Sequence, residues 1–216
     1  MKTTVLLFFS LISAFLFVPQ LFSQGLNSIT ASNSQNVMAV GNNGKILKTS
    51  TGGNGWSLYV VNNTVNYNSV SSAGNYYFLS ASNGRVYKTS VNVINLTEQN
   101  TGVTASLNSV TFLDSLNGFA CGANGTVIKT TNGGTNWTNT NNNIGSVILN
   151  SVSFKDLNNG VIVGDSGKVF LTSNGGLNWT LQPSLTNRNL LKVKYYNQGI
   201  VIVGEYGVII KKDNIN

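Results

Sequence analysis

The stretch LNSVSFKDLNNGVIVGDSGKVFLTSNGGLNWT, from Leu149 to Thr180, decides the fold. Apolar segments rich in Val, Ile, Phe and Thr alternate with short segments of Gly, Asn and Asp. β-Branched and aromatic residues favour the half-buried surface of a strand, whereas Gly, Asn and Asp favour tight turns. The stretch therefore predicts short strands joined by turns, with room for about four of them.

The first phrase of this stretch returns along the chain at intervals of 40 to 42 residues. Its five versions are LNSIT, YNSVS, LNSVT, LNSVS and LLKVK, and they begin at Leu26, Tyr67, Leu107, Leu149 and Leu190. A second landmark keeps the same spacing at Gly44, Gly84, Gly125, Gly167 and Gly207. A four-strand repeat of about 40 residues is typical of a β-propeller blade. We therefore predict an all-β fold, a β-propeller with five blades that start near residues 26, 67, 107, 149 and 190.

The fifth copy ends in YGVIIKKDNIN, after its third strand. We expect the last blade to lack its outer strand, which leaves an exposed edge at Val208 to Lys212. Another chain could add a strand there, or Lys211 and Lys212 could discourage such pairing, and the sequence leaves both alternatives open. Only Gln24 and Gly25 would precede the first blade after cleavage, so ring closure is expected to rest on side-chain packing.

The N-terminus has the pattern of a secretory signal peptide. Lys2 precedes an apolar run from Val5 to Val18, and Ser23 offers a small residue for cleavage. We predict a signal peptide at residues 1–23 and a single propeller domain at 24–216. The run is short for a spanning helix, which needs about 20 apolar residues. The chain is therefore expected to be exported, periplasmic or extracellular, with membrane contact only through this segment if it stays uncleaved.

Composition excludes several functions. The formal net charge is +7, but the basic residues are scattered along the chain rather than clustered, so we predict no nucleic-acid binding and favour an acidic surface or partner. The chain has no histidine, and its one cysteine, Cys121 in GFACG, is expected to be a buried apolar residue. With few carboxylates as well, no metal and no cofactor are predicted.

The phrases TTNGGTNWT at Thr130 and TSNGGLNWT at Thr172 resemble the Asp-box, or bacterial neuraminidase repeat, with the pattern Ser/Thr-x-Asp-x-Gly-x-Thr-Trp. Together with LNSVxF and GxxG, the blade pattern resembles that of the photosystem II stability and assembly factor family. In that family the box fixes a hairpin: the Asp accepts turn N–H groups, glycine allows positive φ, and tryptophan packs into the core. This resemblance implies structural roles for Trp56, Gly133, Gly134, Trp137, Gly175, Gly176 and Trp179.

The copies depart from the box pattern in a graded way. The Asp position holds Thr51, Val91, Asn132 and Asn174. An asparagine oxygen can accept the same bonds as aspartate, threonine does so less well, and valine cannot. The second copy also has Leu96 in place of tryptophan.

The resemblance implies a non-catalytic scaffold, because such assembly factors bind membrane-protein intermediates on the exported side of a membrane. Their arginine-rich patch is not matched, since the chain has only Arg85 and Arg188. The same shortage excludes sialidases, which share the box and clamp a carboxylate with three arginines.

Other enzymatic functions find little support. Asp114 and Asp156 occupy equivalent turns and are expected to initiate them. Asp165 and Glu205 follow the first glycine of GxxG in consecutive blades and should share one face. Equivalent points on neighbouring blades lie about 10 Å or more apart, beyond the roughly 5–9.5 Å of glycosidase pairs, so we predict no enzyme.

A binding surface remains. Propellers usually bind through the face formed by turns between second and third strands and by loops between blades. On that face we predict a patch of Asp165, Arg188, Glu205 and Tyr206 that binds a protein or peptide. A carbohydrate-binding, lectin-like propeller is the alternative, because Asn-rich loops and tyrosines suit sugars.

A lysine recurs at one position of the third strand in four of the five copies. These residues are Lys48, Lys88, Lys129 and Lys211. A lysine there commonly keeps an outer strand soluble and blocks edge pairing, and we interpret the series in that way.

Overall fold

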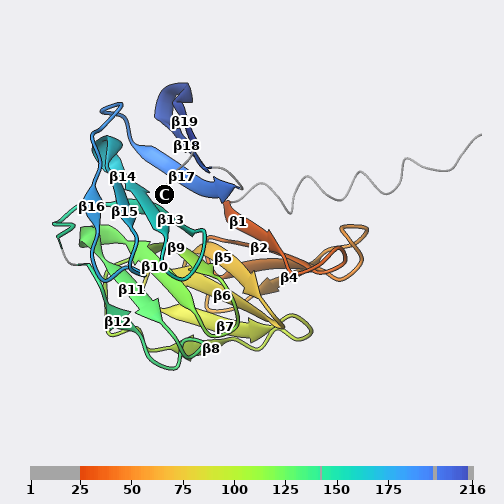
Figure 1. The fold of residues 1–216 in the computed structure, drawn as a ribbon. Coiled ribbons are helices and arrows are strands. Elements are labelled where there is room, and N and C mark those ends of the chain that lie inside the picture. Colours follow the sequence, from red (N-terminus) through yellow and green to blue (C-terminus); the bar gives the residue numbers. More distant parts are fainter. Residues whose placement is uncertain (1–24, 142, 197–198, 214–216) are drawn as a thin grey trace, which may run out of the picture.

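The computed structural model describes residues 25–141, 143–196 and 199–213. They form antiparallel sheets that follow one another along the chain (Figure 1). The first two blades comprise β1 (Leu26–Ala31), β2 (Val37–Gly41), β3 (Lys45–Thr49), β4 (Ser57–Val60), β5 (Tyr67–Ala73), β6 (Tyr76–Ala81), β7 (Val86–Ser90) and β8 (Thr97–Gln99). The next two comprise β9 (Leu107–Phe112), β10 (Gly118–Gly122), β11 (Val127–Thr130), β12 (Thr138–Asn139), β13 (Leu149–Phe154), β14 (Gly160–Gly164), β15 (Val169–Thr172) and β16 (Thr180–Leu181). The last comprises β17 (Leu190–Tyr196), β18 (Gly199–Gly204) and β19 (Ile209–Asp213).

The first strand of each blade begins at one of the five repeat phrases. These strands, β1, β5, β9, β13 and β17, all line a central channel of about 430 Å³. Each sheet then runs outward in chain order, and the described residues give four strands in blades 1 to 4 and three in blade 5. The predicted all-β propeller of five blades is confirmed, and among the described residues the last blade has no outer strand.

The core lies between the blades. One face of each sheet packs on the opposite face of the next, so that Met38 and Val40 of blade 1 meet Tyr67 and Leu79 of blade 2. Cys121 is fully buried in the layer between blades 3 and 4, as expected for an apolar core residue. Burial raises the pKa of its thiol far above the ordinary range, which keeps it protonated.

The asparagine of the repeated LNS phrase joins each blade to the next. Its side-chain amide donates to the carbonyl that opens the following inner strand, a step of 39 to 41 residues along the chain. The four bonds are Asn27 to Tyr67 (3.0 Å), Asn68 to Leu107 (2.9 Å), Asn108 to Leu149 (2.9 Å) and Asn150 to Leu190 (3.0 Å). Hydroxyls beside these asparagines act in the opposite sense: Oγ of Ser109 accepts from the Val152 amide, and Oγ of Ser151 accepts from the Val193 amide. The phrase is therefore an interblade clasp.

The recurring lysines form a second clasp near the outer rim. The Nζ groups donate to carbonyls in the loop before the fourth strand of the next blade: Lys48 to Asn92 (3.2 Å), Lys88 to Gly133 (3.4 Å) and Lys129 to Gly175 (3.0 Å). Our interpretation of these three lysines as residues that keep an outer strand soluble and block edge pairing is wrong, because their strands pair with a fourth strand and each Nζ bonds the neighbouring blade. Lys211 in blade 5 instead pairs with Asp213 (3.2 Å).

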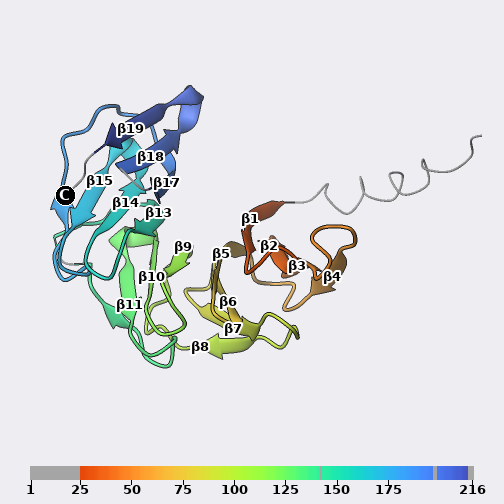
Figure 2. The ribbon, with the colours of Figure 1, turned by 45° about the vertical axis from the view of Figure 1, so that its right-hand side comes forward.

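The two ends of the array are open. Figure 2 shows the blades as an arc in which blades 1 and 5 do not stack face to face. Ile29 of blade 1 is 64% exposed, whereas its four equivalents in the later blades, Val70, Val110, Val152 and Val193, are 5–6% exposed because the preceding blade covers each of them. At the other end Ile209 of blade 5 is 73% exposed. The packing that was expected to close the ring is not formed between the described residues.

The predicted signal peptide, residues 1–23, lies outside the described residues. Within the part of the chain that the structure describes, no helix has the length and apolar character needed to cross a membrane.

Candidate functional site

The box loops are held by the residues at the Asp position. In blade 3, Oδ1 of Asn132 accepts from the Thr130 hydroxyl (3.0 Å) and from the Asn136 amide (2.9 Å). Asn174 makes the equivalent bonds in blade 4. The glycine pairs 133–134 and 175–176 all have positive φ, between 67° and 87°, which glycine adopts without strain. In the second copy, Val91 is buried in the apolar layer instead.

The box tryptophans lie in the layers between blades. Trp137 meets the ring of Phe112 edge-on at 6.0 Å, and Trp179 meets Phe154 in the same way at 6.0 Å. Trp179 is buried and Trp137 is partly buried, so neither presents an open aromatic face to a ligand. Trp56 of blade 1 is also partly buried and lines a surface groove with Lys48 and Tyr59.

The structure brings Arg188 and Tyr206 together. The Arg188 guanidinium lies 4.5 Å from the centroid of the Tyr206 ring, although the loop before blade 5 carries one residue and the turn between β18 and β19 the other. Tyr206 is 83% exposed. It also has φ +56°, a left-handed conformation that is unusual for a bulky residue. The equivalent positions in three other blades hold the smaller residues Asn43, Asn124 and Ser166, with φ of 54–56°.

The two carboxylates predicted in this patch have different surroundings. Oδ1 of Asp165 accepts from the side-chain amide of Asn150 (2.8 Å), the residue that clasps blade 4 to blade 5. Glu205 belongs to the equivalent turn of blade 5, and its own backbone amide donates to the Asn189 carbonyl. Asp165 is thus part of the contact between blades 4 and 5. The Arg188–Tyr206 pair is the part of the predicted patch that remains as a candidate binding surface.

The acidic residues at the turns between first and second strands serve those turns. Oδ1 of Asp114 accepts from the amides of Leu116 and Asn117, and Oδ1 of Asp156 accepts from those of Asn158 and Asn159, as predicted. Hydrogen bonds from Asn117 and Asn159, side chain first, hold the pKa of each carboxyl below its ordinary value.

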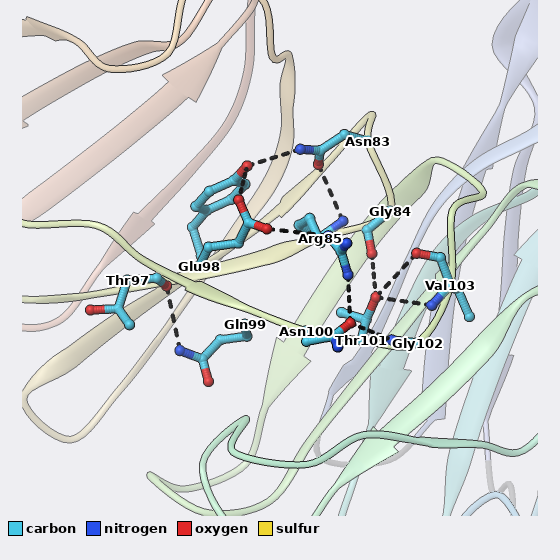
Figure 3. A network of polar contacts seen from close by, with 11 residues as sticks. Asn83, Gly84, Arg85, Thr97, Glu98, Gln99, Asn100, Thr101, Gly102 and Val103 are labelled. Atoms are coloured by element: carbon cyan, nitrogen blue, oxygen red, sulfur yellow. Dashed lines mark hydrogen bonds and ion pairs between the residues drawn. The ribbon is translucent and has the colours of Figure 1, made fainter.

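A polar network on blade 2 was not predicted from the sequence (Figure 3). Arg85 forms an ion pair with Glu98 (3.3 Å) and donates to the side chain of Asn100. Glu98 in turn accepts from the hydroxyl of Tyr87, and burial raises the pKa of that hydroxyl. The network connects the turn after β6 to the loop after β8, so the guanidinium of Arg85 is bonded within its own blade. The sequence signal was weak, because Glu98 lies 13 residues after Arg85 and 11 after Tyr87 and the residues follow no motif.

Within the described ranges, no group of three or more Asp, Glu, His or Cys side chains is placed to hold a metal ion.

These features define a β-propeller whose polar side chains mostly serve its own turns and joints. The family model described as photosynthesis system II assembly factor YCF48 matches residues 90–181, from the third strand of blade 2 to the fourth strand of blade 4. The predicted resemblance to this family is confirmed over that part of the chain.

Solved structures extend the likeness in fold. A structure described as YCF48 bound to D1 peptide is 16% identical, with a TM-score of 0.72, and the match covers 89% of this chain and 64% of that one. YCF48 from Cyanidioschyzon merolae is 19% identical, with a TM-score of 0.71, over 89% of this chain and 68% of that one. The computationally designed protein Ika4 is 12% identical, with a TM-score of 0.56, over 69% of this chain and 91% of that one. A search of curated protein sequences gave no match.

Proposed function

We propose that this chain is an exported, non-catalytic scaffold that binds a protein or peptide through the Arg188–Tyr206 pair. Tyrosine and arginine are, with tryptophan, the residue types enriched among the few residues that dominate the binding energy of protein interfaces. The similar YCF48 structure is described with a bound peptide, which supports the same class of ligand here. The net charge of +7 favours an acidic partner.

The conformation of Tyr206 carries this proposal. A bulky residue in the left-handed region costs about 1 kcal/mol or more of stability, and such strain persists mainly at functional sites. Two equivalent turns, at positions 43 and 124, hold asparagine, which tolerates this conformation better. Tyr206 thus lowers the stability of the fold at a position where the equivalent turns hold a smaller residue.

The test compares Tyr206→Asn with the unchanged protein. We expect the free energy of unfolding, measured by urea denaturation, to be about 1 kcal/mol larger for the variant, because the backbone strain is relieved. Its retention on membrane extract of its own source should fall about tenfold, because the aromatic anchor is lost. Protease treatment of the extract should abolish retention of the unchanged protein, whereas periodate should not.

Full retention of the Tyr206→Asn variant would contradict the proposed site. Loss of retention after periodate alone would instead establish the carbohydrate-binding alternative.

A further inference from the structure

The outer edge of blade 5 differs from that of every other blade. In blades 1 to 4 the third strand pairs with a fourth, whereas no strand of the described part of the chain pairs with the outer side of β19. One third-strand position shows the effect on packing. Its residue is buried in the first four blades, as Leu47, Tyr87, Ile128 and Phe170, but Ile210 is only partly buried.

An apolar cavity of about 260 Å³ lies beside this edge, between blades 4 and 5. Aliphatic side chains from both blades line it, among them Val169, Leu171, Ile200, Ile202 and Ile210. A second cavity of about 520 Å³ also contains Leu171, Gln182 and Lys212 in its lining and extends to Tyr195. The two cavities therefore lie side by side along the outer half of blade 5, and together they are called the groove below.

Blade 4 shows what normally fills such a groove. There Trp179, just before the fourth strand, packs edge-on against Phe154. Phe154 and Tyr195 each follow directly after the five-residue repeat phrase of their blade, so Tyr195 holds the place of Phe154 in blade 5. The groove beside Tyr195 is therefore the position that an aromatic side chain of a fourth strand would take.

The backbone of β19 offers the matching hydrogen-bond acceptor. In blades 3 and 4, the carbonyls of Val127 and Val169 accept from Thr140 (2.8 Å) and Gln182 (2.9 Å), which follow the fourth strands. Ile209 holds the same place in blade 5, because it pairs with Val203 as Val169 pairs with Val163. An added strand would meet the Ile209 carbonyl at the open edge.

The charge at the groove indicates which residue the bound segment should carry. Thr172 of blade 4 anchors the box loop, since its hydroxyl accepts from the amides of Asn174 and Gly176. The equivalent residue in blade 5 is Lys212, which lines both cavities and can accept no hydrogen bond. A carboxylate at the box position of an incoming segment would complement this lysine.

The geometry points to the groove between blades 4 and 5 as a docking site for an extended segment of a partner protein. The segment adds to β19 as a fourth strand, inserts one large apolar side chain, tryptophan best, beside Tyr195, and brings an acidic residue to Lys212. This site is separate from the Arg188–Tyr206 pair.

The chain itself supplies the probe. The labelled peptide NGGLNWTLQ, which repeats residues 174–182, should bind the purified protein saturably in fluorescence anisotropy. A peptide with alanine in place of tryptophan should bind at least about tenfold more weakly, because a buried aromatic is lost. Absence of binding, or equal binding of the two peptides, would overturn the proposal.

Two variants locate the site. Ile210→Trp fills the cavity from within and should weaken peptide binding about tenfold or more, with a melting temperature no lower than that of the unchanged protein. Val203→Trp adds the same ring on the opposite, exposed face of the sheet and should leave binding unchanged. Equal effects of both variants would contradict the groove, and Tyr206→Asn should leave binding of this peptide unaltered whether or not that tyrosine serves another partner.

The role of Lys212 has its own comparison. The peptide DGGLNWTLQ should bind the unchanged protein about three- to tenfold more tightly than NGGLNWTLQ, and Lys212→Met should abolish that difference. If the variant still bound the two peptides with different affinities, Lys212 would not be part of the site. Sedimentation of the protein alone should show a monomer, and a dimer that the peptide dissociates would show that a second copy, not another protein, occupies the edge.

Discussion

Blades 4 and 5 have similar first three strands, but they differ in their hydrogen bonds to a following blade and in their outer half. Blade 4 clasps the next blade through Asn150 and Ser151, and its fourth strand and Trp179 complete its outer half. At the clasp positions blade 5 has Leu191 and Lys192, which cannot make the same bonds. The comparison teaches that the strands define a blade, whereas a few polar side chains and one aromatic define whether it is joined and complete.

The largest expected difference between these blades is in their aromatic layers. Phe154 stacks on Phe119 at 3.7 Å and 12°, while its equivalent Tyr195 lines an open groove. Phe154→Ala should lower the free energy of unfolding by about 3–5 kcal/mol, because it empties a packed layer. Tyr195→Ala should cost only about 1–2 kcal/mol. Urea denaturation measures both, and equal losses would mean that the outer half of blade 5 is as well packed as that of blade 4.

The asparagine clasp should have the next largest effect. Asn150→Leu installs the residue that blade 5 carries and removes the bond to the Leu190 carbonyl, so we expect a loss of about 1–2 kcal/mol in the free energy of unfolding. The reverse change, Leu191→Asn, should alter stability by less than about 0.5 kcal/mol, because no blade formed by the described residues offers a carbonyl beside it. A clear stabilisation by Leu191→Asn would reveal that blade 5 does meet another blade in solution.

The lysine clasp should have the smallest effect, because its partly buried charge remains hydrated. Lys129→Met removes the bond to the Gly175 carbonyl and should cost about 0.5–1 kcal/mol. Lys211→Met removes only a surface pair with Asp213 and should be neutral within about 0.3 kcal/mol. Thermal denaturation of both variants at low and high salt checks this prediction, which fails if the two lysines behave alike.

The sequence determined what depends on neighbouring residues. Alternating apolar segments and Gly-Asn turns set the strands, the constant spacing set five blades, and the box residues indicated their loops, because hairpins form from contacts only a few residues apart. Part of the candidate site followed as well, since Arg188 and Tyr206 were placed on one face.

Only the tertiary structure decided which residues reach across blades. The partners of Asn150 and Lys129 lie 40 and 46 residues away, and the series of asparagines and lysines identifies none of them. The same holds for the groove beside Ile210 and the open faces at Ile29 and Ile209, since these depend on how the sheets stack. Sequence periodicity fixes which face of a strand is apolar, but the packing of whole sheets decides whether anything covers that face.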